Sequence, residues 1–159
     1  MINYVKGNLL DSDCDYICHQ VNCQGVMGSG VAKQIRERWP EVYDAYRERY
    51  EQHDRIGIPT EDMLGDVEAI YIDDGDQERY VVNMYSQHSY GYDDHRYTSY
   101  DAFADCLSQI SAFVPYGYTI GFPKNIGCGL GGGNWKVISA LIEEILGKDY
   151  EVYIYELEE

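Results

Sequence analysis

Basic residues are scarce in this sequence: 12 lysines and arginines stand against 28 aspartates and glutamates, giving a formal net charge of −16 at pH 7. Duplex nucleic acid is bound chiefly through phosphate contacts with Lys and Arg. The basic residues form no cluster beyond the pairs Arg36/Arg38 and Arg47/Arg49. The composition therefore argues against an extended nucleic-acid surface. An anionic ligand would have to be met by backbone amides and helix ends.

The sequence also lacks an apolar run near the roughly 18 residues that a membrane span needs. Its first residues have neither the basic nor the apolar region of a signal peptide. We therefore expect a cytoplasmic protein with no membrane partner. The five cysteines are odd in number and include no C-x-x-C pair, which argues against a disulfide framework or a zinc site. We expect reduced, mostly buried thiols, no metal and no cofactor.

What the sequence does contain is an alternation of strand-like and helix-like segments in a length typical of one domain. Apolar runs predict strands over 2–6, 16–22, 67–72, 79–84, 119–122 and 152–155, with an acidic turn at 73–76. Helical spacing predicts helices over 29–39, after Pro40, over 98–113 with Thr98 or Ser99 as the cap, and from Trp135 to a stop at Gly147. This order predicts a mainly parallel sheet covered on both faces. Ligands bind such sheets beyond the carboxyl ends of the strands.

Two glycine-rich segments, residues 25–30 and 127–133, hold 8 of the 16 glycines. Each follows a predicted strand and precedes a predicted helix, an arrangement that suits a phosphate because backbone N–H groups can approach it closely. Neither segment is a P-loop, and the first does not have the G-x-G-x-x-G spacing of a dinucleotide-binding fold. Two such segments in one domain favour a diphosphate held from both sides.

Three ordered motifs resemble the macrodomain, an ADP-ribose-binding module: VKGNLL at 5–10, VNCQGVMGSGVA at 21–32 and FPKNIGCGLGG at 122–132. The resemblance spans nearly the whole chain and is greatest to terminal ADP-ribose glycohydrolases, DNA ADP-ribose hydrolases and ADP-ribose phosphate phosphatases. It implies a single macrodomain over 1–159, with a three-layer α/β/α fold and a central mixed, mainly parallel sheet. The implied partner is ADP-ribose or an ADP-ribosylated macromolecule, bound by a monomer.

The resemblance also implies a set of binding residues. Asn8 and Leu9 match the adenine end, although Asn8 equally suits a turn cap. Asn22 matches the residue at the distal ribose, the alternative being an Asn that closes a strand end. The glycine loops would wrap the ribose and the diphosphate through Gly25, Val26, Met27, Gly28, Ser29, Gly30 and Val31 on one side, and Ile126, Gly127, Cys128, Gly129, Leu130 and Gly131 on the other.

Residues 83–87 follow a predicted strand, and we expect Asn83, Tyr85 and Gln87 beside the adenine and proximal ribose. Tyr85 or Tyr90 would then stack on the base or pack the surface. Residues 87–100 form a polar, tyrosine-rich loop, which we interpret as a lid.

The catalytic status stays open at this stage. The similar glycohydrolases use a lysine and an aspartate, and our matching puts Met84 and Gly131 at those positions. The remaining candidates for catalysis are Asn22 and His88, since an imidazole suits general acid–base work. Three interpretations compete: a hydrolase that removes ADP-ribose or a distal phosphate, a non-catalytic ADP-ribose reader or nucleotide sponge, and a small interaction protein whose glycine loops are structural.

Overall fold

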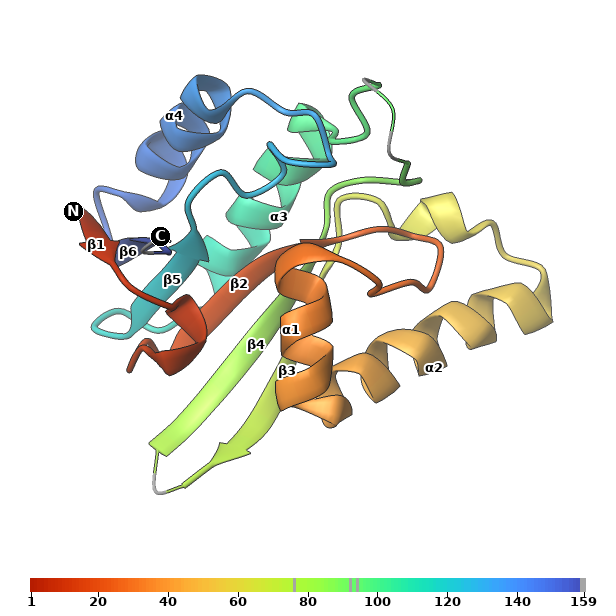
Figure 1. Ribbon diagram of the computed structural model, residues 1–159, viewed down its shortest axis with the longest axis horizontal. Coiled ribbons are helices and arrows are strands. Elements are labelled where there is room, and N and C mark those ends of the chain that lie inside the picture. Colours follow the sequence, from red (N-terminus) through yellow and green to blue (C-terminus); the bar gives the residue numbers. More distant parts are fainter. Residues whose placement is uncertain (76, 92, 94, 158–159) are drawn as a thin grey trace.

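A computed structural model of the chain describes residues 1–75, 77–91, 93 and 95–157. Six strands form one mixed sheet in the order β1-β6-β5-β2-β4-β3, in which every neighbouring pair is parallel except β3 with β4 (Figure 1). The strands are β1 (Ile2–Lys6), β2 (Tyr16–Val21), β3 (Val67–Asp74), β4 (Gln77–Tyr85), β5 (Thr119–Pro123) and β6 (Glu151–Glu156). The prediction of a mixed, mainly parallel sheet is confirmed.

Helices cover both faces of this sheet. The helices α1 (Gly30–Arg38) and α2 (Pro40–Ile56) pack on one face, and α3 (Tyr100–Phe113) and α4 (Trp135–Leu146) pack on the other. Pro40 separates the first two because proline is tolerated in the first turn of a helix but not in its interior. Ser99 caps α3 by accepting a hydrogen bond from the Ala102 amide, which decides between the two predicted caps.

Some local predictions need correction. Asp73 and Asp74, predicted to lie in a turn, extend β3 because they pair with Glu78 and Gln77 across the hairpin; Asp76 lies outside the described residues. Two short 3-10 helices, η1 (Leu9–Asp11) and η2 (Thr60–Met63), were not predicted. Each is a single turn, too short to produce an apolar periodicity in the sequence.

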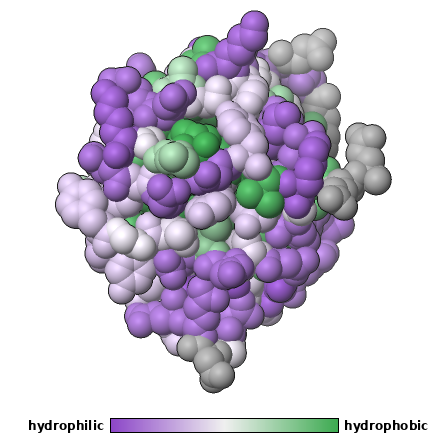
Figure 2. All heavy atoms as spheres, turned by 90° about the vertical axis from the view of Figure 1, so that its left-hand side faces the viewer, coloured by the Kyte–Doolittle hydropathy of each residue, from purple (hydrophilic) through white to green (hydrophobic). Residues whose placement is uncertain are grey.

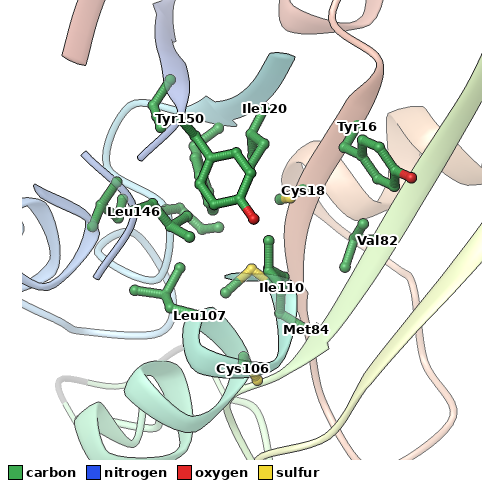
Figure 3. Packing of buried hydrophobic residues seen from close by; sticks show 14 of the residues in the cluster. Tyr16, Cys18, Val82, Met84, Cys106, Leu107, Ile110, Ile120, Leu146 and Tyr150 are labelled. Atoms are coloured by element: carbon green, nitrogen blue, oxygen red, sulfur yellow. The ribbon is translucent and has the colours of Figure 1, made fainter. Parts of the chain in front are cut away.

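The sheet separates two apolar clusters. In the cluster below α3 and α4, Cys18 and Met84 from the sheet meet Leu107 and Ile110 of α3 (Figure 3). The opposite cluster packs Trp39, Val42 and Tyr46 against the sheet. The face beside β1 and α4 is mostly hydrophilic, with small separate apolar patches (Figure 2). Within the described residues, no helix has the length and apolar character to cross a membrane.

Candidate functional site

Three adjoining pockets form one cleft at the carboxyl ends of β2 and β5. The middle pocket lies between the two glycine loops, residues 25–30 and 127–133, and is lined by residues of both. It shares Val31 and Lys124 with the pocket on the side of η1, and Gln20 and Gln87 with the pocket at the end of β2. The loops therefore face each other across a continuous groove where the topology predicts a ligand.

The first glycine loop takes its shape from Asn22, the residue after β2. Its side-chain Nδ2 donates to the Val26 carbonyl at 2.9 Å, and its Oδ1 accepts from the Gln24 amide at 2.9 Å. Tyr46 of α2 donates its hydroxyl to the same Oδ1 at 2.7 Å. At Gly25, with φ of 74°, a Cβ would lie 2.5 Å from an Arg47 nitrogen. The amide of Asn22 thus closes the strand end and fixes the loop from within.

The second glycine loop is held by backbone groups and by Thr98. The Thr98 hydroxyl donates to the Gly127 carbonyl at 2.7 Å, and the Thr98 amide donates to the Gly131 carbonyl at 2.9 Å. Gln20 lies on the cleft floor and donates its side-chain Nε2 to Thr98 Oγ1 at 2.9 Å and to Gln87 Oε1 at 2.6 Å. The segment predicted to be a lid is therefore fastened to the second loop near Thr98.

In the part of the chain that the structure describes, residues whose backbone amides lack a partner line the middle pocket on both sides. Within the described residues, no acceptor is present for the amides of Gly127, Gly129, Leu130 and Gly131. Across the pocket, Ser29 precedes α1, whose first intrahelical hydrogen bond runs from Lys33 to the Ser29 carbonyl. The earlier amides of that first turn have no partner within the helix. A helix N-terminus and a glycine loop both favour an anion at such a point.

Among the described residues that line the three pockets, Lys124 is the one lysine or arginine. Its Nζ lies 3.0 Å from Glu156 Oε2. His19, on β2 below the middle pocket, is buried and its Nε2 lies 2.5 Å from Asn83 Oδ1. Burial lowers the pKa of His19 to about 4, although the Asn83 contact opposes this shift, so the imidazole is neutral near pH 7.

The structure brings most of the residues chosen from the sequence to this cleft. The lining includes Asn8, Leu9, Asn22, Val26, Gly28, Ser29, Gly30, Val31, Gln87, Ile126, Gly127, Gly129, Leu130 and Gly131. Asn8 also caps η1, since its Oδ1 accepts from the Leu10 amide at 3.0 Å.

The expected ligand contacts of Asn83 and Tyr85 were wrong. Both side chains are fully buried, because β4 is a central strand covered by helices on both faces. Tyr85 stacks on Tyr46 with ring centroids 5.9 Å apart, and Arg49 lies over its ring. Neither side chain is open to a ligand.

Gly25, Met27, Cys128 and His88 also lie off the cleft lining. Met27 is buried in the core, and Cys128 packs against the opposite apolar cluster, where burial raises the pKa of its thiol. The His88 carbonyl accepts from the Cys23 amide at 3.0 Å. His88 therefore borders the first loop from outside the groove.

Several lining residues were not among those chosen from the sequence, notably Gln20, Lys124 and Tyr155. The adjacent polar residues His19 and Gln20 in the otherwise apolar run of β2 were the signal available for Gln20. Lys124 stands inside the motif FPKNIGCGLGG. Tyr155 enters the cleft because β6 pairs with β5, a neighbourhood that sequence order does not reveal.

The two positions matched to a catalytic lysine and aspartate differ in character. Met84 is fully buried in the apolar cluster below α3. At Gly131 a Cβ would lie 2.5 Å from Thr98 Oγ1 and 2.7 Å from the Gly127 carbonyl oxygen. An aspartate therefore does not fit this loop conformation. Among the described residues, no three His, Cys, Asp or Glu side chains come together as a metal site.

No protein-family model matches the chain. The DNA ADP-ribosyl glycohydrolase of Mycobacterium tuberculosis is 48% identical over 46 residues, which are 29% of this chain and 13% of that protein. The DNA ADP-ribosyl glycohydrolase of Thermus aquaticus is 28% identical over 162 residues, 98% of this chain and 41% of that protein. An ADP-ribose 1''-phosphate phosphatase of Scheffersomyces stipitis is 40% identical over 52 residues, covering 29% of this chain and 30% of that protein. The chain thus spans well under half the length of these relatives.

Solved structures agree over almost the full chain. The macrodomain of Thermus aquaticus DarG has a TM-score of 0.76 at 26% identity, covering 98% of this chain and 97% of that one. The macrodomain of Mycobacterium tuberculosis DarG has a TM-score of 0.77 at 25% identity, with coverage of 98% and 97%. The strand order, the two facing glycine loops and these similarities agree, and the chain has the macrodomain fold.

Proposed function

We propose that this chain binds ADP-ribose, or the ADP-ribosyl group of a modified macromolecule, in the cleft between its glycine loops. The observation that carries the proposal is the pair of amide sets that face one pocket: the first turn of α1 on one side and Gly127 to Gly131 on the other. A diphosphate has oxygens on both sides to accept from both sets. Backbone amides can bind phosphate oxygens without cationic side chains, and lysine and arginine are few in this chain, whose net charge is −16.

The composition of the two outer pockets supports an orientation for the ligand. Leu9, Val31, Tyr155 and Leu157 line the pocket beside η1, which suits a planar base. Gln20, Asn22 and Gln87 line the other end, which suits the hydroxyls of a ribose. We therefore place the adenine beside Asn8 and the distal ribose beside Gln87. This keeps the match of Asn8 and Leu9 to the adenine end and moves the adenine away from residues 83–87.

Release of the ADP-ribosyl group is a second candidate function. Its support is the position of Asn22 at the ribose end of the cleft, together with the activities named for the Thermus and Mycobacterium relatives. The buried Met84 and the unsubstituted Gly131 offer no nucleophile or proton acceptor. A hydrolytic step in this chain would rely on a water molecule and on the substrate's own groups. Without such a step, the protein is a reader of ADP-ribose.

Calorimetric titration with ADP-ribose, with AMP as comparator, tests the binding proposal. Micromolar affinity that requires the distal ribose is expected. Gly129→Glu places a carboxylate where the diphosphate would lie, and a Cβ at Gly129 meets nothing within 4 Å, so the loop can accept the side chain. Gly129→Gln is the matched neutral control. We expect the glutamate to abolish binding and the glutamine to weaken it less; equal affinities for the two variants and the wild type would remove the second loop from the site.

Incubation with ADP-ribosylated protein, ADP-ribosylated DNA and ADP-ribose 1''-phosphate separates the two functions. Release of ADP-ribose or phosphate that is lost in Asn22→Ala supports a hydrolase, whereas binding without any release supports a reader. No binding of ADP-ribose at all would leave the third interpretation, an interaction protein with structural loops. We further propose that residues 1–159 form one macrodomain that acts as a monomer in the cytoplasm.

A further inference from the structure

Five aromatic rings form a continuous row across the sheet, at the end opposite the cleft. Tyr71 of β3 contacts Tyr80 of β4 at a centroid distance of 5.8 Å, and Tyr80 stacks on Tyr16 of β2 at 5.1 Å. Tyr16 in turn contacts Phe113 at 6.0 Å and Tyr118 at 6.2 Å. We call these five residues the aromatic row. It joins two strands of the antiparallel hairpin, a central strand, the end of α3 and the turn before β5.

The aromatic row is separate from the nucleotide cleft. Tyr16 is the first residue of β2, whereas the cleft lining begins at His19 and Gln20, toward the other end of that strand. At about 3.3 Å per residue, the two sites lie roughly 10 Å apart along β2. Figure 3 shows the Tyr16 hydroxyl directed away from the packed centre of the apolar cluster. The row therefore faces a different part of the molecular surface.

The outer rings of the row are open to solvent. The exposed fraction is 52% for Tyr71, 46% for Tyr118 and 38% for Phe113, while Tyr16 beneath them is 8% exposed. Large exposed aromatic side chains gathered in one place are typical of interaction surfaces rather than of ordinary solvated surface. The buried ring of Tyr16 holds its neighbours in place. The row therefore offers a preformed aromatic platform, with little ordering cost on binding.

The surroundings of the platform carry negative charge and almost no positive charge. The sequence has no lysine or arginine between Arg55 and Arg79, nor between Arg96 and Lys124, and these two stretches supply Tyr71, Phe113 and Tyr118, three of the five rings. Glu78 is exposed and accepts a hydrogen bond from the Tyr80 hydroxyl at 2.7 Å.

Two further charged groups flank the row. Asp15 is half-buried and accepts from the Thr119 amide at 2.8 Å. Arg79, next to Tyr80 in sequence, is 3% exposed, because its Nε donates to the Cys14 carbonyl and its guanidinium pairs with Asp74. This arginine therefore does not offset the carboxylates at the surface.

We propose that the aromatic row docks an arginine-rich segment of a partner protein. A guanidinium can stack flat on a tyrosine ring while its N–H groups, which lie in the guanidinium plane, donate to a carboxylate. An arginine of the partner could therefore stack on the ring of Tyr71 or Tyr118 and pair with a neighbouring acidic side chain. Nucleic acid and anionic lipid would both bring phosphates against Glu78 and Asp15, which disfavours them. Tyrosine and arginine are also the residues that contribute most at protein interfaces. The proposal is independent of what the cleft binds.

Fluorescence anisotropy with labelled nine-residue peptides tests the proposal, using the full chain. The peptides alternate glycine with arginine, lysine or citrulline. We expect the arginine peptide to bind at least fivefold more tightly than the lysine peptide, and the citrulline peptide not to bind. Tyr71→Ala/Tyr118→Ala leaves the net charge unchanged and removes two outer rings; it should weaken arginine-peptide binding five- to tenfold.

Tyr4→Ala is the matched control, since Tyr4 is 62% exposed on the opposite edge strand β1. It should bind the arginine peptide as the wild type does. A thermal midpoint within a few degrees of the wild type shows that each variant is folded. Glu78→Gln is a second test: it removes one carboxylate charge beside the aromatic row and leaves the rings in place, and it should weaken binding of the arginine peptide. Equal binding of the arginine and lysine peptides, unaffected by Tyr71→Ala/Tyr118→Ala, would show attraction to the net charge alone and overturn the proposal.

Discussion

The two glycine loops face the same pocket but are held in different ways. The first loop is held mainly by one side chain, because Asn22 forms hydrogen bonds with the Gln24 amide, the Val26 carbonyl and the Tyr46 hydroxyl. In the second loop, the contacts are short backbone turns, such as Gly133 to the Gly127 carbonyl at 2.8 Å. The shape of the first loop therefore depends on the Asn22 side chain, whereas the shape of the second loop depends on glycines that leave no Cβ in the space between the loop and Thr98.

This difference predicts how each loop fails. Removing the Asn22 amide should loosen the first loop while leaving the space around it unchanged. Adding a side chain to the second loop should force atoms apart, since a Cβ at Gly127 or Gly131 would meet Gln20 or Thr98 within about 3 Å. Loosening and overpacking give different signals in amide exchange and in thermal unfolding.

The largest effect is expected for Gly127→Ala. Gly127 has φ of 73°, and its added Cβ would lie 2.8 Å from Gln20 Oε1 and 3.1 Å from Thr98 Oγ1. The left-handed conformation costs about 1–2 kcal/mol, and the overpacking adds about 1–3 kcal/mol. We expect the free energy of unfolding to fall by roughly 3 kcal/mol, measured by urea denaturation. Gly129→Ala, whose Cβ meets nothing within 4 Å, is the control and should stay within about 0.5 kcal/mol of wild type.

Asn22→Ala should have the next largest effect. The Tyr46 hydroxyl keeps the Asn22 carbonyl as an acceptor at 2.7 Å and still accepts from the Val26 amide at 3.1 Å, but the Gln24 amide loses its acceptor. We expect a loss of about 2 kcal/mol in the free energy of unfolding, with faster hydrogen exchange at the Gln24 amide. Asn3→Ala is the control: it removes a half-buried asparagine on β1 that donates to Glu151 and to the Val152 carbonyl, and it should leave exchange at the Gln24 amide unchanged. Unchanged exchange at the Gln24 amide in Asn22→Ala would mean that the first loop does not depend on this side chain.

The sequence predicts the sheet well because the apolar periodicity of its strands is a local signal. Strand and helix bounds agree with the structure to within a few residues, and Pro40 and Ser99 mark real boundaries. The glycine content of residues 127–133 likewise points directly at the cleft, since such a run has a steric purpose. These features depend on neighbouring residues, so they need no knowledge of the tertiary structure.

The errors fall where tertiary packing decides. Tyr85 follows Met84 at the end of β4, and nothing local distinguishes a tyrosine that faces α2 from one that faces a ligand. Tyr155 and Gln20 join the cleft through strand neighbours that are far apart in sequence. The order β1-β6-β5, which brings Tyr155 beside Lys124, is likewise not visible along the chain.

Acid should destabilise the protein through the strand that carries the first loop. The pKa of His19 is about 4 in the folded chain because of burial, against 6.5 for a free imidazole, so between these values only the unfolded chain binds the proton. The free energy of unfolding should therefore fall as the pH falls through this window, by roughly 1 kcal/mol per pH unit. His19→Gln should flatten the slope between pH 6.5 and 5, above the range in which most carboxylates titrate. The same slope in both proteins would mean that another group dominates.

The smallest expected effect is the salt dependence of ADP-ribose affinity. It distinguishes a diphosphate site made of backbone amides from one made of lysine and arginine side chains. Phosphate sites made of lysine and arginine lose affinity steeply as salt screens the charges. Here the diphosphate would face backbone amides from both loops, and the one lining cation, Lys124, is paired with Glu156. The net charge of −16 repels the ligand at long range, and salt screens that repulsion. We expect ADP-ribose affinity, measured by calorimetry, to stay level or rise about twofold between about 0.03 and 0.3 M NaCl, where the Debye length falls from roughly 18 to 6 Å. A tenfold loss would place the diphosphate on Lys124 rather than on the glycine loops.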